Sequence, residues 1–225
     1  MAATSTVVIP GSSLCKQAWW PQLHRTIIIA FQQKDIQAFP PSWTRLNLDE
    51  ALGAAELAKE LGTYGEMAIM FSDDEPVACG GISPHSAAYL SLNNPDWLSV
   101  VNKKLIEHQA ASGENPEDAD VLPQVQCVCE DWNVLCFCVH PDHRGKNLSR
   151  QLLQTLADVA KAKGGRRLLS NFCIEETGSF WPKMGFNARV GNGGVLEKGY
   201  IRKGAVEELQ TDLHFMRMSK DLYQK

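Results

Sequence analysis

The chain has 225 residues, of which 44% are hydrophobic, so it has enough apolar side chains to fill the core of one domain. Its formal net charge is −4, which gives no overall positive field to attract nucleic acid. The longest wholly apolar run, Val134–Val139, is far shorter than the roughly 20 residues of a membrane-spanning helix. Met1–Pro10 lacks the basic and apolar regions of a secretory signal, and the chain has no C-x-x-C pair. We therefore expect a cytoplasmic protein that binds no metal.

The first part of the chain predicts one short strand and two helices. Thr6–Ile9 is rich in β-forming residues and is followed by a Pro-Gly pair. The next apolar residues recur at intervals of three or four, the spacing of one buried helix face: Trp20, Leu23, Ile27 and Phe31. Asn47 and Glu50 resemble a capping box at the start of a second helix, which ends at Gly62. The expected buried face of this second helix consists of Leu52, Ala55, Ala58 and Leu61.

A β-hairpin and an acidic stretch follow. Met67–Phe71 and Pro76–Ile82 are typical of two strands joined by an acidic turn. Residues 84–131 carry eight carboxylates and two lysines, which gives them a net charge of −6. We interpret them as an insertion into the domain, because they have too few apolar residues to fold alone. Two interpretations of the insertion stay open: a solubilising surface loop, or a lid that attracts a cationic substrate.

The C-terminal part predicts strands and helices in mixed order. Trp132–Val139 is apolar on both alternating faces except at Asn133, so we expect it to be a strand at the centre of a sheet. A helix over residues 146–163 has an apolar stripe of Leu148, Leu152, Leu156 and Val159. The remaining expected elements are strands at Arg167–Cys173, Arg189–Leu196 and Leu213–Met218 and a short helix at Thr177–Met184. This order indicates an α/β or α+β fold.

The connection between the central strand and the long helix is a candidate phosphate site. The first N–H groups of a helix have no partner within it, and the helix dipole is positive at that end. Arg144, Lys146 and Arg150 add cations at the same point. Together these features favour the binding of a phosphate or pyrophosphate. Neither the Walker motif nor G-x-G-x-x-G is present, so the phosphate belongs to another kind of cofactor.

This part of the chain resembles the GNAT superfamily of N-acetyltransferases. The superfamily has a hydrophobic strand, then V-x-P, then Q/R-x-x-G-x-G/A at the start of a helix, and later Y-x-x-x-G-F. Here Val139-His140-Pro141 and Arg144–Ser149 are followed, about thirty residues later, by the F-W-P-K-M-G-F of residues 180–186. The resemblance implies one domain over residues 1–225, with an acidic insertion at about 84–131. It also implies a central mixed, mostly antiparallel sheet of six or seven strands flanked by helices.

The resemblance further implies which residues hold acetyl-CoA. In the family, backbone amides of the signature turn bind the CoA pyrophosphate, and the preceding strand pairs with the pantetheine arm and polarises the thioester carbonyl. Carried over, the cofactor-binding residues are Phe137, Cys138, Val139, Arg144, Gly145, Lys146, Asn147, Leu148, Ser149 and Trp181. Asn147 and Ser149 replace two glycines of the signature, and asparagine tolerates the left-handed backbone region better than most residues. Trp181 replaces the tyrosine that protonates the departing thiolate in the family.

The residue that deprotonates the acceptor amine is not fixed by the resemblance. No carboxylate lies within the central strand, and the nearest are Glu130 and Asp131 at its entry. They are our candidates for a catalytic base, with a solvated strand end as the alternative interpretation. Glu175 and Glu176 after the next strand, and His85 after the hairpin, are the next nearest.

Several residues that could suggest other chemistry are more typical of a core. Cys136 and Cys138 could form an acyl-cysteine intermediate, but both lie in an apolar run, so we interpret them as buried core residues. The pair Trp19 and Trp20 likewise favours packing over ligand binding.

The sequence therefore predicts an acetyl-CoA-dependent N-acetyltransferase. The expected reaction moves an acetyl group to a primary amine of a small molecule, by direct attack in a ternary complex. Two alternatives stay open: a protein lysine or N-terminal acetyltransferase, or a non-catalytic acyl-CoA-binding module, which Trp181 and the altered glycines suggest. We expect no nucleic-acid or membrane partner, and both a monomer and a homodimer are compatible with the sequence.

Overall fold

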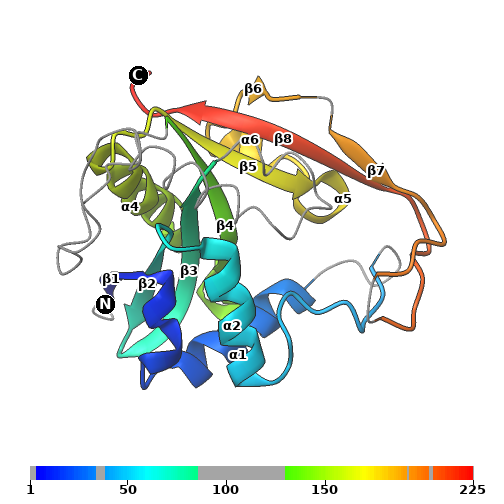
Figure 1. Ribbon diagram of the computed structural model, residues 1–225, viewed down its shortest axis with the longest axis horizontal. Coiled ribbons are helices and arrows are strands. Elements are labelled where there is room, and N and C mark those ends of the chain that lie inside the picture. Colours follow the sequence, from blue (N-terminus) through cyan, green and yellow to red (C-terminus); the bar gives the residue numbers. More distant parts are fainter. Residues whose placement is uncertain (1–3, 34–38, 86–129, 192, 203–204, 225) are drawn as a thin grey trace, which may run out of the picture.

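The computed structural model describes residues 4–33, 39–85, 130–191, 193–202 and 205–224. Its strands are β1 (Thr4–Pro10), β2 (Glu66–Ser72), β3 (Glu75–Pro84), β4 (Asp131–Val139), β5 (Arg167–Cys173), β6 (Ala188–Arg189), β7 (Gly194–Leu196) and β8 (Leu213–Asp221). They form one sheet in the order β1-β2-β3-β4-β5-β8-β6, with β7 also paired to β8 (Figure 1). Among the strand pairs of the described residues, only β4–β5 is parallel. The predicted mixed, mostly antiparallel sheet is confirmed.

The helices cover both faces of this sheet. They are η1 (Gly11–Lys16), α1 (Trp20–Gln32), α2 (Glu50–Leu61), η3 (Pro141–His143), α4 (Leu148–Ala162), α5 (Ile174–Thr177) and α6 (Phe180–Lys183). Alternate side chains of β2 point to opposite faces, as expected of a strand. Met67 and Ile69 pack with α1 and α2, whereas Ala68 and Met70 pack with α4. The sheet is therefore a middle layer with an apolar core on each side.

The expected buried faces of α1 and α4 are confirmed, whereas that of α2 is confirmed only at Leu61. Asp49, not Asn47, caps α2, because its carboxylate accepts hydrogen bonds from the amides of Ala51 and Leu52. The buried residues of α2 are Gly53, Ala54, Leu57 and Leu61. Leu52 is 55% exposed. The helix contains two overlapping stripes of Ala and Leu at helical spacing, so periodicity alone could not tell which one is buried.

Three further segments differ from the prediction. The helix expected at Thr177–Met184 is two short helices, α5 and α6, because Gly178 between them adopts a positive φ of 52°. The strand expected at Arg189–Leu196 is divided into β6 and β7, so the described sheet has eight strands where six or seven were expected. The short helix η1 was not predicted.

The acidic stretch enters and leaves the sheet at neighbouring points. Pro84 at the end of β3 pairs with Trp132 near the start of β4, and the His85 amide donates to the Asp131 carbonyl at 2.8 Å. Residues 86–129 lie outside the described residues, so the helix and the loop expected there, and the possible lid, stay predictions. Within the described ranges, no helix is long and apolar enough to cross a membrane.

Candidate active site

A cleft opens where β4 and β5 part. The two strands pair only between residues 131–134 and 167–170, whereas β5 continues to pair with β8 as far as Cys173. Figure 1 shows β4 and β5 diverging from their common end. The cleft has a volume of about 910 Å³, and residues 134–139 and 170–173 form two of its walls. It therefore exposes the part of β4 that lacks a neighbouring strand.

β4 is distorted in the middle of this wall. Its register with β3 shifts by one residue, so that Cys136 and Phe137 together lie opposite Gly80. A Cβ at Gly80 would lie 2.8 Å from the Phe137 ring, so this position needs glycine. Cys136 has a φ of +45°, a backbone conformation that is costly for a residue with a side chain. Such bulges re-aim neighbouring groups and are frequent beside active sites.

The turn after β4 presents backbone donors to the same cleft. Gly145 and Asn147 have φ values of 76° and 62°, so Asn147 adopts the left-handed conformation that its side chain tolerates. α4 starts at Leu148 with no side-chain cap and no acidic residue in its first turn. Its first N–H groups are therefore free to bind an anion at the positive end of the helix dipole. Lys146 does not line the cleft, unlike Gly145 and residues 147–150.

Arg144 fixes the position of this turn. Its Nε donates to the Val139 carbonyl at 3.3 Å, and one terminal nitrogen donates to the Ala30 carbonyl of α1 at 3.2 Å. These bonds connect the end of β4, the turn and α1. The guanidinium still lines the cleft, where it adds positive charge beside the free amides of α4.

Trp181 forms part of an aromatic wall of the cleft. It is 7% exposed, and its ring lies 5.0–6.1 Å from four phenylalanine rings: Phe137, Phe172, Phe180 and Phe186. Among the described residues its Nε1 has no hydrogen-bond partner, and neither has the hydroxyl of Ser170, which is 1% exposed and lines the same cleft. A buried donor without a partner costs about 1–3 kcal/mol. Both donors belong to residues that line the cleft, although the two polar atoms are themselves buried.

Solved structures share this fold at low sequence identity. An aminoglycoside 6'-acetyltransferase type Ii matches with 12% identity and a TM-score of 0.52 over 98% of this chain and 99% of that chain. A putative acetyltransferase from Salmonella typhimurium, solved with its cofactor acetyl-CoA, has 11% identity and a TM-score of 0.52 over 100% and 96%. The ribosomal-protein-S18-alanine N-acetyltransferase from Escherichia coli has 12% identity and a TM-score of 0.53 over 99% and 96%. These matches show the fold.

A sequence model of the family identifies the chemistry-bearing part of the chain. Residues 117–188 match the model described as an acetyltransferase (GNAT) domain. This segment contains β4, the turn, α4 and Trp181. This part of the chain is therefore similar to the GNAT acetyltransferases. No curated protein sequence matches it.

The two predicted bases lie away from the cleft. The Asp131 carboxylate binds Arg167 through two hydrogen bonds of 2.7 Å, and Glu130 lies 3.8 Å from Arg166. Neither carboxylate lines the cleft. Asp131 begins β4, at the end of the strand opposite to the phosphate turn. Both groups are placed to pair with the start of β5.

Of the two carboxylates after β5, Glu176 lines the cleft and Glu175 does not. Burial opposes ionisation of Glu175, but hydrogen bonds from the Cys173 thiol and from the ring and amide of His214 lower its pKa to about 2. Glu175 is therefore a structural anion that connects α5 to β8. His85, the remaining candidate, contacts Asn133 at 3.1 Å and does not line the cleft.

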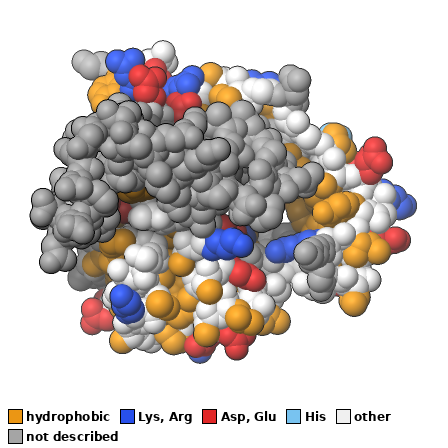
Figure 2. All heavy atoms as spheres, in the orientation of Figure 1, with side chains coloured by type: hydrophobic (Ala, Val, Ile, Leu, Met, Phe, Trp, Pro, Cys, Tyr) orange, Lys and Arg blue, Asp and Glu red, His pale blue; other side chains and the backbone are white. Residues whose placement is uncertain are grey.

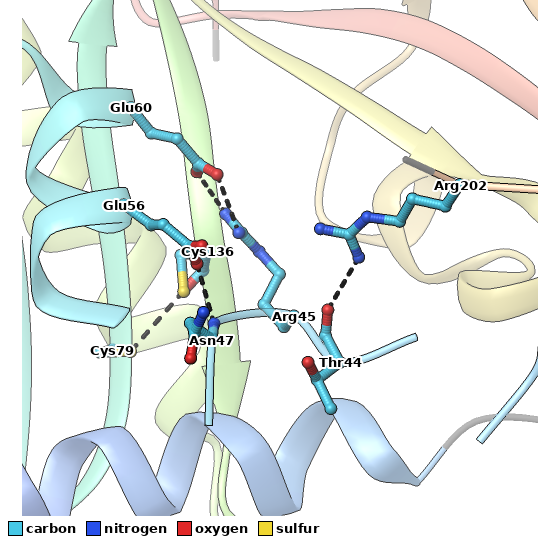
Figure 3. Close-up of polar contacts among 8 residues, drawn as sticks. All are labelled: Thr44, Arg45, Asn47, Glu56, Glu60, Cys79, Cys136 and Arg202. Atoms are coloured by element: carbon cyan, nitrogen blue, oxygen red, sulfur yellow. Dashed lines mark hydrogen bonds and ion pairs between the residues drawn. The ribbon is translucent and has the colours of Figure 1, made fainter. Parts of the chain in front are cut away.

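The wall opposite the phosphate turn is built from distant segments. Arg45 donates to both carboxylate oxygens of Glu60 on α2, and the Asn47 amide donates to Glu56 at 2.8 Å. These bonds hold residues 44–47 against α2 (Figure 3). Arg202, from the connection between β7 and β8, completes this side of the cleft. No sequence motif marks Arg45, Arg202 or Ser170 as site residues, so they were not among the residues predicted from the sequence.

Three cysteines of β3 and β4 pack behind this wall. Cys136 and Cys138 are 6% and 8% exposed, which confirms that they belong to the core, although both also border the cleft. The Cys79 thiol lies 3.6 Å from the Cys138 sulfur and from the Cys136 carbonyl, and burial raises the pKa of Cys79. Interaction with Cys79 and, more weakly, with the Arg45 guanidinium lowers the pKa of the Cys136 thiol against the effect of burial. Nowhere in the described ranges do three His, Cys, Asp or Glu side chains gather as metal ligands.

Proposed function

We propose that this enzyme transfers an acetyl group from acetyl-CoA to a primary amine of a small molecule, by direct attack while both are bound. One observation carries the proposal: the gap between β4 and β5 leads to the uncapped start of α4. A thioester arm with two amides can pair with the free part of β4, and a pyrophosphate can accept hydrogen bonds at the helix start. Acetyl-CoA supplies an activated acetyl group when bound.

The expected contacts of the cofactor follow the order of the chain. The backbone of Phe137, Cys138 and Val139 would pair with the pantetheine arm. The amides of Gly145 and residues 147–149 would hold the pyrophosphate, with Arg144 beside them. A smaller adjoining pocket is lined by Arg150, Lys183 and Lys220. Its cations suit the 3'-phosphate of CoA.

Trp181 and Ser170 are our candidates for stabilising the departing thiolate. An indole N–H is too weakly acidic to protonate a thiolate, but it can donate a hydrogen bond to one. Both groups are buried donors without a partner in the cleft. A donor aimed at the place where negative charge develops lowers the barrier without any rearrangement during the reaction.

Glu176 is the carboxylate that the geometry favours as the base. It lines the cleft, whereas the sequence-predicted Glu130 and Asp131 pair with arginines at the opposite end of β4. The amine must lose a proton to attack, and a carboxylate within reach, directly or through one water, can remove it. Glu176→Gln should therefore lower kcat and shift the dependence of kcat on pH, whereas Glu130→Gln should leave both unchanged.

The free thiols support the expected reducing, cytoplasmic setting. The sulfurs of Cys79 and Cys138 lie 3.6 Å apart across neighbouring strands without a disulfide. Such pairs persist as thiols where glutathione and thioredoxin keep cysteines reduced.

A thiol-release assay with acetyl-CoA tests the proposal. The acceptors would include polyamines, amino acids, aminoglycosides and peptides with a free lysine or N-terminus. Release that depends on a small amine is expected. Release with peptides alone would support the protein-acetylating alternative, and CoA binding without release would support a non-catalytic module. One equivalent of CoA released without any amine would indicate an acyl-cysteine and refute direct attack.

A further inference from the structure

We propose that the acceptor carries a carboxylate besides its amine, and that Arg202 binds this carboxylate. The substrate class would then be amino acids and related amino carboxylates. The inference rests on the proposed function and names the substrate of the same cleft.

Arg202 lines the cleft and belongs to the connection between β7 and β8. One of its terminal nitrogens donates to the Thr44 carbonyl at 2.9 Å, and Figure 3 shows the side chain extending from the β7–β8 connection toward residues 44–47. This bond holds the guanidinium between two walls of the cleft. A guanidinium has five N–H donors in a fixed fork that matches a carboxylate. Within the described residues only one of them is used, and its acceptor is uncharged.

The other arginines that line the cleft differ from Arg202 in their hydrogen-bond partners or in their position in the fold. Arg45 is already neutralised by two hydrogen bonds to Glu60. Arg144 binds two carbonyls at the phosphate turn, and Arg150 belongs to the first turn of α4. Arg202 is thus the arginine that adds an unneutralised positive charge to the wall opposite the phosphate turn, as far as the described residues extend. Such a charge favours an anionic group on the second substrate.

The rest of this wall suits the remaining parts of an amino acid. Glu176 adds a carboxylate to the cleft, which can receive the proton of an ammonium group. Phe39, Trp43 and Phe215 offer apolar surface, and the Trp43 ring packs edge-on against Tyr200 at 6.1 Å. Figure 2 shows hydrophobic side chains gathered at the right of the molecule, the side on which Figure 1 draws the β7–β8 connection. Tyr200 and Val206, which belong to the same connection as Arg202, are exposed hydrophobic residues. An amino carboxylate with an apolar side chain matches all three features.

The test compares acceptors that differ only in the carboxylate. L-phenylalanine and L-phenylalaninamide have the same amine and the same ring, but the amide lacks the negative charge. The amide is the more easily deprotonated amine, so without recognition of the carboxylate it should be the better acceptor. We expect kcat/KM to favour the acid by about tenfold or more, the usual effect of a charged hydrogen-bonded pair. A third acceptor, an amine that bears a phosphate, is tested in parallel, because a guanidinium also binds phosphate.

Arg202→Gln should remove the preference and raise the KM of the acid about tenfold or more. Its KM for acetyl-CoA and its kcat/KM with the amide should stay within about twofold of the wild type, because neither involves the carboxylate. The ratio of kcat/KM for the two acceptors also cancels any loss of folded enzyme. Arg25→Gln, at an exposed position of α1 away from the cleft, is the matched control and should change nothing.

The outcomes separate this inference from the proposed function. Acetyl transfer that prefers the amide, or an acid preference that survives in Arg202→Gln, would overturn the inference and leave the function standing. If the enzyme prefers the phosphate-bearing amine, and Arg202→Gln removes that preference, then Arg202 binds a phosphate. That result would overturn the proposal that it binds a carboxylate. No transfer to any amine would overturn the proposed function itself.

Discussion

Replacing Trp181 by phenylalanine should separate the role of its N–H group from the role of its ring. The indole is buried among four phenylalanine rings, and its Nε1 has no partner. Trp20 provides a matched control, because it is 4% exposed and its Nε1 donates to the Glu50 carbonyl at 2.9 Å. One substitution removes an unpaired donor, and the other removes a paired one.

The two substitutions should differ in their effect on the free energy of unfolding. Loss of ring volume costs about 1–3 kcal/mol in either core. At Trp181 the change also removes an unpaired buried donor, which returns about 1–3 kcal/mol, so the net change should lie within about 2 kcal/mol of zero. At Trp20 the lost hydrogen bond adds about 1 kcal/mol, for a total of about 2–4 kcal/mol. Because the loss of ring volume is common to both, the Trp20 variant should be less stable than the Trp181 variant by about 2–4 kcal/mol.

Activity should change in the opposite order. Trp181→Phe should lower kcat about 10- to 100-fold with little change in the KM for acetyl-CoA, because the lost donor acts on charge that develops during the reaction. Trp20→Phe should leave kcat of the folded enzyme unchanged. Urea denaturation and steady-state thiol release measure the two effects. Equal destabilisation of the two variants, together with an unchanged kcat for Trp181→Phe, would refute the reasoning.

Three further predictions concern the turn and the ion pair after β5. Asn147→Gly should keep CoA affinity, whereas Asn147→Val should weaken it about tenfold in calorimetry, because a β-branched residue at positive φ costs about 1–2 kcal/mol; equal affinities would contradict the role of this backbone conformation. Ser149→Glu should abolish CoA binding through repulsion of the pyrophosphate, while Gln151→Glu, the same charge change at an exposed position outside the cleft, should retain it. The pKa of Glu175 is depressed from 4.5 to about 2, so its stabilisation is present above pH 4.5 and is lost as pH falls toward 2. Glu175→Gln should therefore lower the free energy of unfolding by about 1–2 kcal/mol at pH 6 but not near pH 2, and an equal loss at both pH values would contradict the ion pair.

The local part of the site could be predicted from the sequence. The strand that ends at Val139, the turn and the start of α4 are contiguous, so their chemistry follows from short-range pattern and from the helix terminus. The left-handed conformation of Asn147 could also be anticipated, because its side chain is one of the few that tolerate it. The burial of Cys136 and Cys138 could also be predicted, because both lie in an apolar run.

The rest depends on contacts between segments distant in the sequence. Arg45 and Arg202 are 157 positions apart, yet both border one cleft. Glu130 and Asp131 were the nearest carboxylates in the sequence, but the parallel pairing of β4 with β5 sets them beside Arg166 and Arg167. A residue that is close to the site in sequence can still be far from it in space, because each residue of a strand advances the chain by about 3.3 Å. The bulge at Cys136 likewise depends on its register with β3 and leaves no signal in its own sequence.

The gap between β4 and β5 joins these findings into one argument. A sheet that parts leaves strand amides and carbonyls without partners, which the fold could avoid by continuing the pairing beyond Val134 and Ser170. The same region holds a strained residue at Cys136 and two unpaired buried donors at Ser170 and Trp181. Each of these features costs stability in the free protein, and all of the residues concerned line one cleft. An amide-bearing arm that ends in a thioester would pair with the strand, and its sulfur and carbonyl oxygen would offer acceptors to the unpaired donors.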